Sequence, residues 1–238
     1  MPLSTEYKVV RRAVIITLSF TAGLWLILIV EKIGGFDLNR LGILPRTLYG
    51  LIGIITSPLI HEGVFHLLAN TLPLIILGIG LFYFYYKIAA EVVFWLYLST
   101  GFWVWVIGRN AFHIGASGII YGLMAFIIVS GLIRRNVRSL AISMAVFVLY
   151  GGMIYGVFPV EPHVSWESHL MGLLSGIILA FFFRKQPIYV GDDLDEGSED
   201  EPENENNIPY FTNGDNSSDK DVNITYEFKP SAKDQARD

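Results

Sequence analysis

Six long apolar stretches dominate this sequence and restrict what it can fold into. They run approximately over residues 13–33, 66–86, 89–108, 117–133, 139–158 and 166–184. Each is close to the roughly 20 residues that a helix needs to cross a bilayer core of about 30 Å. Of all residues 53% are hydrophobic and 16% charged, and the charges gather at a few places instead of covering a soluble surface. The sequence therefore predicts an all-α membrane protein with six transmembrane helices.

The composition changes at Gln186, where the apolar stretches end. Residues 186–238 hold fifteen acidic and four basic residues and few large hydrophobic ones. Such a segment cannot bury enough apolar surface to fold alone, so we expect an acidic disordered tail. A partner-docking segment near residues 224–228 is the alternative for part of it. The predicted organisation is an N-terminus over residues 1–12, a membrane domain over 13–185 and a tail over 186–238.

The distribution of lysine and arginine predicts the orientation in the membrane. Short cytoplasmic loops accumulate these residues. In the predicted topology nine of them lie at one end of the helices and four at the other. We therefore expect an integral, multi-pass protein with both termini in the cytoplasm, in a bacterial inner membrane. The nine are Lys8, Arg11, Arg12, Lys87, Arg134, Arg135, Arg138, Arg184 and Lys185, and the four are Lys32, Arg40, Arg46 and Arg109.

A serine and a histidine stand near the outer ends of two predicted helices. Ser117 begins the fourth apolar stretch and His169 lies near the start of the sixth. Serine is common in membrane helices as a small packing residue, so Ser117 alone proves little. An ionisable residue inside a membrane helix is costly and is a functional candidate by default. A histidine at the depth of a serine predicts a nucleophile with its general base.

A second polar group lies at the start of the second predicted helix. His66 and Asn70 are four residues apart, so they share one helix face, and both offer donors that suit an oxyanion. Each residue alone is more simply explained by ordinary hydrogen bonding. His61-Glu62 resembles the opening of a zinc-protease signature, but the second histidine follows at i+5 instead of i+4. We therefore expect no metal and no other cofactor.

These motifs together resemble the rhomboid family of intramembrane serine proteases. The similarity spans about residues 10–185 and rests on Gly115-Ala-Ser-Gly118, on His61 and His66 followed by Asn70, and on Glu167-Ser-His-Leu-Met-Gly172. It implies a rhomboid-like six-helix bundle with a long first outer loop. It also implies a serine-type endopeptidase, a hydrolase that cuts transmembrane proteins within or beside the bilayer.

The resemblance assigns roles to individual residues. Ser117 would be the nucleophile and His169 the general base. His66 and Asn70 would form the oxyanion hole, and Tyr121 would stack on the catalytic histidine. As supporting residues, Gly115 and Gly118 flank the nucleophile, and His61 would be structural in the long first loop.

Three further features of the sequence are the arginines of the first loop, two more histidines and pairs of glycines. Many bacterial members of the family carry a Trp-Arg pair in the first loop, whereas this chain has Arg40 and Arg46 without a preceding tryptophan. His113 and His163 are interpreted as loop residues. Three small-residue pairs are expected to let helices approach closely: Gly118 with Gly122, Gly152 with Gly156, and Gly172 with Gly176.

Alternative functions remain at this point. One is a catalytically inactive relative that binds membrane proteins. Another is a small transporter, although the chain lacks an inverted repeat of broken helices. The expected partners are transmembrane protein substrates and the lipid bilayer, without nucleic acid. Oligomeric state, natural substrate and the role of the tail are not predicted.

Overall fold

The computed structural model describes residues 5–135, 137–161 and 164–188, and within these ranges every regular element is helical. One isolated bridge pairs Ile43 with His113. The described residues belong to a unit that covers Met1–Gly197. The predicted tail lies outside the described residues except for residues 186–188. His163 also lies outside them, so its predicted place in an outer loop stays a prediction.

Six long helices match the six predicted stretches. Their bounds are α1 Thr5–Gly34, α3 Val64–Phe84, α4 Ala89–Ile107, α5 Ser117–Arg134, α6 Val137–Tyr150 and α7 Trp166–Phe182. The 3-10 helix η4, Gly151–Val157, extends α6. Five segments are long and apolar enough to cross a membrane, namely α1, α3, α4, α5 and Val137–Val157. The sixth, α7, is apolar but has only 17 residues.

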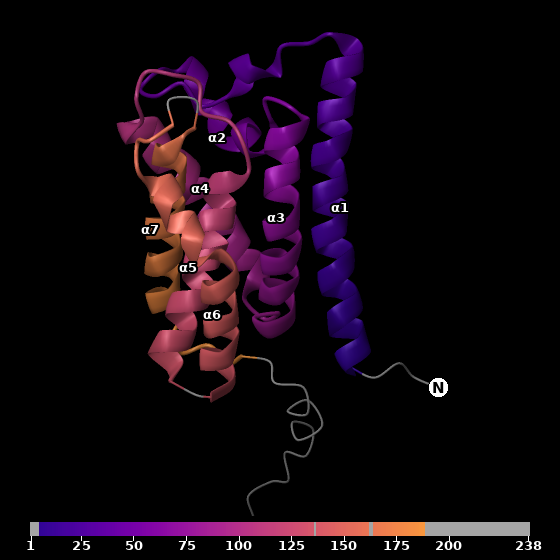
Figure 1. The fold of residues 1–238 in the computed structure, drawn as a ribbon, viewed down its shortest axis with the longest axis vertical. Helices are drawn as coiled ribbons and strands as arrows, with labels where there is room; N and C mark the ends of the chain where they lie inside the picture. Colours follow the sequence, from indigo (N-terminus) through magenta and orange to yellow (C-terminus); the bar gives the residue numbers. More distant parts are fainter. Residues whose placement is uncertain (1–4, 136, 162–163, 189–238) are drawn as a thin grey trace, which may run out of the picture. The chain divides into compact units, whose positions relative to one another are not determined.

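Helix α1 starts eight residues before the predicted boundary at residue 13. The apolar pattern marks only the part of a helix that can lie in lipid, whereas backbone hydrogen bonding continues through Lys8, Arg11 and Arg12. Figure 1 shows the start of α1 and the end of α7 at the same end of the bundle. An even number of crossings would place them in this way, and the number of six stays a prediction, because five segments have the length and apolarity of a span.

Helix α5 is the most buried of the candidate spans. Of its 18-residue window 72% is buried, against 17–33% for the other four. It packs against α3, α4, α6 and α7, whereas α1 packs mainly against α3 (Figure 1). A membrane helix enclosed by protein can carry polar side chains without exposing them to lipid. Ser117, at the start of α5, has such a position.

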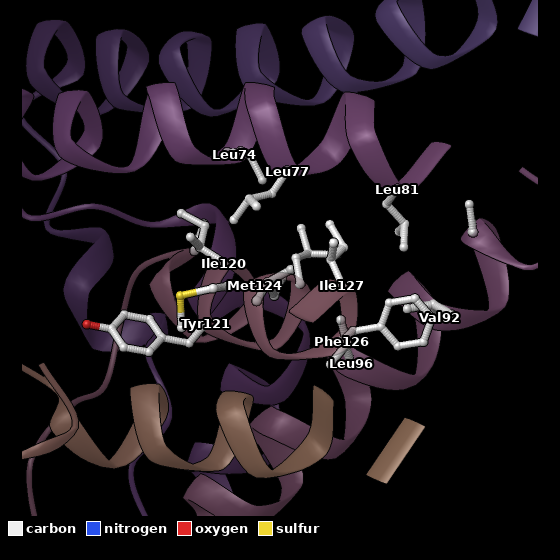
Figure 2. Packing of buried hydrophobic residues seen from close by; sticks show 14 of the residues in the cluster. Leu74, Leu77, Leu81, Val92, Leu96, Ile120, Tyr121, Met124, Phe126 and Ile127 are labelled. Carbon is white, nitrogen blue, oxygen red and sulfur yellow. The ribbon is translucent and has the colours of Figure 1, made fainter. Parts of the chain in front are cut away.

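The hydrophobic core lies between α3, α4 and α5. Figure 2 shows Leu74 and Leu77 of α3 beside residues of α5 such as Ile120 and Met124. Leu96 of α4 belongs to the same cluster and has no exposed surface. Helix α5 is therefore packed against α3 and α4 as well as against α7.

Glycines bring α5 and α7 into backbone contact. A Cβ atom added at Gly172 would lie 1.9 Å from the carbonyl oxygen of Gly118, and one at Gly176 would lie 2.2 Å from that of Gly122. Only glycine permits this approach, which agrees with the packing predicted for these two pairs. For the third pair the prediction was wrong at Gly152, where a Cβ atom would meet nothing within 4 Å, but a Cβ atom at Gly156 would lie 2.0 Å from the hydroxyl oxygen of Tyr121. Gly152 lies in η4, where the chain has left the regular helix.

The long first loop connects α1 to α3 and packs onto the C-terminal end of α4. It contains η1 Leu38–Leu41, η2 Tyr49–Leu51, α2 Gly53–Thr56 and η3 Ser57–Leu59. Arg46 Nη1 donates to the carbonyl oxygen of Gly108 at 2.8 Å. The backbone N–H of Arg46 donates to the carbonyl oxygen of Trp105 at 2.9 Å. Arg40 pairs with Asp37 at 3.4 Å on the surface. Arg46, rather than Arg40, therefore anchors the loop.

Candidate active site

Ser117 and His169 meet across the α5–α7 contact. Ser117 is the first residue of α5 and His169 the fourth of α7. Ser117 Oγ lies 2.8 Å from His169 Nε2, and each residue is only 8% exposed. This distance is that of a hydrogen bond between a nucleophile and a general base. The structure thus joins the two residues that the sequence singled out.

The hydrogen bond at the other ring nitrogen indicates the tautomer of His169. Nδ1 lies 2.8 Å from the carbonyl oxygen of Gly156 in η4. A carbonyl oxygen can only accept, so Nδ1 carries the proton in the neutral ring. Nε2 is then the acceptor and takes the hydroxyl hydrogen of Ser117. A histidine can act as a general base only if its unprotonated nitrogen faces the hydroxyl group in this way.

Tyr121 lies flat against the imidazole ring of His169. The two ring centroids are 4.1 Å apart and the planes differ by 5°. Tyr121 donates its hydroxyl hydrogen to the carbonyl oxygen of Met153 at 2.7 Å. Two backbone carbonyls of η4, at Gly156 and Met153, therefore orient the stacked pair. Sequence reasoning missed both residues, because a backbone carbonyl is present at every position and leaves no pattern.

His66 and Asn70 face the same cavity as Ser117 and His169. The cavity has a volume of about 600 Å³. Asn70 Nδ2 is buried and has no hydrogen-bond partner within the described part of the chain. A buried donor without a partner is costly, so an oxygen that arrives in the cavity gains a ready hydrogen bond. The cavity is lined by Asn39, Glu62, His66, Ala69, Asn70, Arg109, Phe112, Ile114, Ser117, Tyr121, Met153, Val164, Ser165 and His169.

Glycines at the start of α5 make room for neighbouring groups. Gly115 has φ +106°, and a Cβ atom there would lie 2.9 Å from Cε1 of His66. A side chain at this position would be strained and would push His66 away. A Cβ atom at Gly118 would lie 3.0 Å from the carbonyl oxygen of Ser168. Both glycines are needed for close approach around the nucleophile.

His61 lies behind the site and contacts the chain next to the nucleophile. Its Nε2 accepts a hydrogen bond from the backbone N–H of Ala116 at 3.3 Å. Burial, with the neighbouring His66 as a smaller cause, lowers the pKa of His61 to about 4. His61 is therefore neutral near pH 7, and its hydrogen bond to Ala116 links it to the turn before Ser117.

Helical spacing does not exclude a zinc ion shared by His61 and His66, contrary to the prediction from the sequence. His61 precedes α3 instead of lying on it, so the helix period does not separate it from His66. The two ring centroids are in fact 5.1 Å apart. Within residues 5–135, 137–161 and 164–188, however, no three His, Cys, Asp or Glu residues form a group that could hold a metal ion. A metal site would need at least one further ligand beside the two rings.

Comparisons with known proteins agree with this geometry. The family described as Rhomboid domain matches residues 49–186. An uncharacterized protein of Mycobacterium tuberculosis is 36% identical over 178 residues, which cover 69% of this chain and 72% of that protein. An uncharacterized protein of Mycobacterium leprae is 35% identical over 178 residues, covering 69% and 68%. RHOMBOID-like protein 1 of Arabidopsis thaliana is 29% identical over 169 residues, covering 68% and 41%. The resemblance seen in the sequence is confirmed, and this chain belongs to the rhomboid family of membrane proteins.

Proposed function

We propose that this protein hydrolyses peptide bonds in or beside transmembrane segments of other membrane proteins. Membership of the rhomboid family supports an intramembrane protease-like function in general. The observation that carries the finer proposal is the 2.8 Å contact between Ser117 Oγ and His169 Nε2 in a polar cavity inside an apolar bundle. A hydroxyl becomes nucleophilic when a base takes its proton, and a neutral histidine does so near pH 7.

The first half of the reaction follows from this pair. His169 Nε2 takes the Ser117 proton while Oγ attacks the scissile carbonyl carbon, and the carbonyl oxygen becomes an oxyanion. We assign His66, Asn70 and the backbone N–H of Ser117 to that oxyanion. The positive end of the α5 dipole favours the same charge. The intermediate then collapses, His169 gives its proton to the leaving amine, and an acyl-enzyme ester remains.

The second half restores the enzyme. A water molecule loses a proton to His169 and attacks the ester carbon. The new acid leaves as Ser117 Oγ regains the proton from His169. No carboxylate is needed for this cycle, because the carbonyl oxygen of Gly156 holds Nδ1 as an aspartate does in a triad.

The substrate must unwind locally before it can be cut. A transmembrane helix keeps its carbonyl groups in i to i+4 hydrogen bonds, which hide them from a nucleophile. Water must also reach the serine, and the cavity of about 600 Å³ offers room for both. With the orientation predicted from lysine and arginine, the cavity faces the outer side of a bacterial inner membrane and the termini face the cytoplasm.

The proposal is tested with the purified chain in detergent and a generic transmembrane substrate. Wild type is compared with Ser117→Ala and His169→Ala, with and without a chelator. Ser130→Ala is a matched control, because Ser130 is a fully buried serine on the same helix, about 20 Å away at 1.5 Å per residue. We expect cleavage by wild type and Ser130→Ala alone. Cleavage that survives Ser117→Ala contradicts the serine mechanism, and loss to the chelator alone supports a metal.

The same experiment distinguishes the alternative of a catalytically inactive binding relative. Such a protein would leave the substrate intact in every sample and still retain it on an affinity column. Labelling of Ser117 by a fluorophosphonate gives an independent reading of whether the hydroxyl is activated.

A further inference from the structure

The two chain segments that lead into Ser117 and His169 are joined by a buried polar network. One segment runs from the end of α4 to the start of α5, and the other is the first turn of α7. Four residues form what we call the outer clamp: Arg109, His113, Ser165 and Glu167. None of them was assigned a role from the sequence, and His113 was interpreted only as a loop residue.

Glu167 makes the first link of the outer clamp. Its Oε1 accepts a hydrogen bond from the backbone N–H of Arg109 at 3.3 Å, and its Oε2 lies 3.6 Å from Arg109 Nη1. The Glu167 side chain is 4% exposed, whereas that of Arg109 is 38% exposed. Arg109 Nη2 also donates to the carbonyl oxygen of Val164 at 2.9 Å. A buried carboxylate is tolerated only with such partners, so α7 can start here only while the Arg109 segment is in place.

His113 makes the second link. It is 1% exposed, and its Nε2 lies 3.1 Å from the carbonyl oxygen of Arg109. Since the carbonyl can only accept, Nε2 carries the proton and Nδ1 accepts from the hydroxyl of Ser165 at 2.6 Å. Burial lowers the pKa of His113, which agrees with a neutral ring. The oxygen of Ser165 in turn accepts from Ser168, the residue before His169.

The outer clamp is also tied to the long first loop. The backbone of His113 exchanges two hydrogen bonds of 2.9 Å with Ile43. Three separate parts of the chain therefore converge at one point beside the cavity. The chain of hydrogen bonds ends at Ser168, the residue before His169.

We propose that the outer clamp sets the distance between Ser117 and His169, and that its members are positioning residues for the proposed reaction. Helices α5 and α7 already touch at Gly118 and Gly172, which follow Ser117 and His169 along the two helices. We call Ser117 and His169 together the dyad. The segments that precede the two helices are joined instead by the outer clamp. The outer clamp holds the segments before the two helices, and the glycine contact holds the helices after the dyad. The dyad therefore lies between two fixed contacts. This inference rests on the proposed protease function.

The test compares Glu167→Gln, Arg109→Gln and the double variant with wild type. Glu167 does not line the cavity, so its replacement removes no substrate contact. Glu31→Gln is a matched control, since Glu31 is a buried carboxylate, 2% exposed, at the outer end of α1. Each variant is measured for kcat, KM, the rate of fluorophosphonate labelling of Ser117 and thermal unfolding in detergent.

We expect Glu167→Gln to lower kcat and the labelling rate about 10²-fold with KM within about twofold of wild type. Arg109→Gln should lower kcat similarly, and the double variant should be no worse than the worse single variant, because the two side chains act as one unit. Arg109→Lys restores a positive charge near Glu167 and should recover part of kcat. Where Glu167→Gln does not fold, Arg109→Gln is used, since it removes the same pair from its more exposed side. Because Arg109 lines the cavity, a fall in kcat with KM within about twofold of wild type supports the inference, whereas a rise in KM assigns Arg109 to substrate binding and contradicts it.

The outcomes separate this inference from the function on which it rests. If wild type cuts and labels but Glu167→Gln and Arg109→Gln do so within threefold, the outer clamp does not position the dyad. A loss that Glu31→Gln reproduces, or additive losses in the double variant, also contradicts it. If wild type is no more active than Ser117→Ala, the proposed function fails first.

Discussion

Replacing Gly172 by alanine should separate the nucleophile from its base. The new Cβ atom would lie 1.9 Å from the carbonyl oxygen of Gly118, about 1.5 Å short of the 3.4 Å at which ordinary contact begins. The obstructing atoms are backbone, so no rotamer change relieves the overlap. Helix α7 must therefore move away from α5 by about 1 Å or more.

This movement increases the distance between Ser117 and His169, because both residues lie close to the glycine contact. Ser117 is next to Gly118, and His169 lies three residues before Gly172. A shift of that size takes the 2.8 Å contact between Oγ and Nε2 beyond hydrogen-bond length. Misplacement of a reacting group by about 1 Å costs on the order of 10² in rate, or about 2.7 kcal/mol of barrier. Gly172→Ala should therefore lower kcat at least 10²-fold.

The assay is cleavage of a transmembrane substrate in detergent, with thermal unfolding as the measure of folding. Gly23→Ala is the matched control, because a Cβ atom at Gly23 of α1 meets nothing within 4 Å. Gly176→Ala, with 2.2 Å to the Gly122 carbonyl one turn further inward, should lose less activity than Gly172→Ala. The reasoning is refuted if Gly172→Ala is folded and cuts within threefold of wild type.

Three further predictions follow from the site. Tyr121→Phe loses the hydrogen bond to Met153 but keeps the stacking, so it should cost about 1 kcal/mol of unfolding free energy and leave kcat within tenfold; a collapse of kcat would show that the hydroxyl matters to the chemistry. Gly115→Ala should push His66 away and lower kcat about 10²-fold or more in the cleavage assay, whereas unchanged kcat would exclude His66 from the oxyanion hole. His61 binds its proton with a pKa near 6.5 when unfolded and about 4 when folded. Its contribution to stability is complete above pH 6.5 and is lost as the pH falls toward 4, by about 3 kcal/mol in all. Unfolding temperatures of wild type and His61→Gln measured across that range should converge at low pH, and parallel curves would contradict the assignment.

Local sequence patterns predicted the helices well. The run predicted over residues 117–133 is α5, Ser117–Arg134, and the run over 89–108 is α4, Ala89–Ile107. Length and apolarity of a stretch are local properties, and the bilayer thickness converts them directly into a span. The start of α1 was misplaced because a helix can continue past the apolar run into charged residues.

The site was predicted only where it has a motif. Ser117 and His169 were found because an imidazole is rare inside an apolar stretch and because the motifs around both residues resemble those of the rhomboid family. The carbonyl groups of Gly156 and Met153 were not predicted to take part in the site, because backbone atoms have no sequence signature. The pair Arg109–Glu167 was missed for another reason, namely that its members are 58 residues apart and one of them lies in a loop.

The sequence by itself predicted which segments are apolar enough to cross a membrane and which chemical groups lie near their ends, and it indicated the family to which the chain belongs. Only the tertiary structure decided which nitrogen of His169 faces Ser117, what holds that ring in place, and how the segments before the two residues are joined. The physical reason is that hydrophobicity and side-chain chemistry belong to single residues. Hydrogen-bond direction and a 2.8 Å separation belong to pairs of residues that only folding brings together.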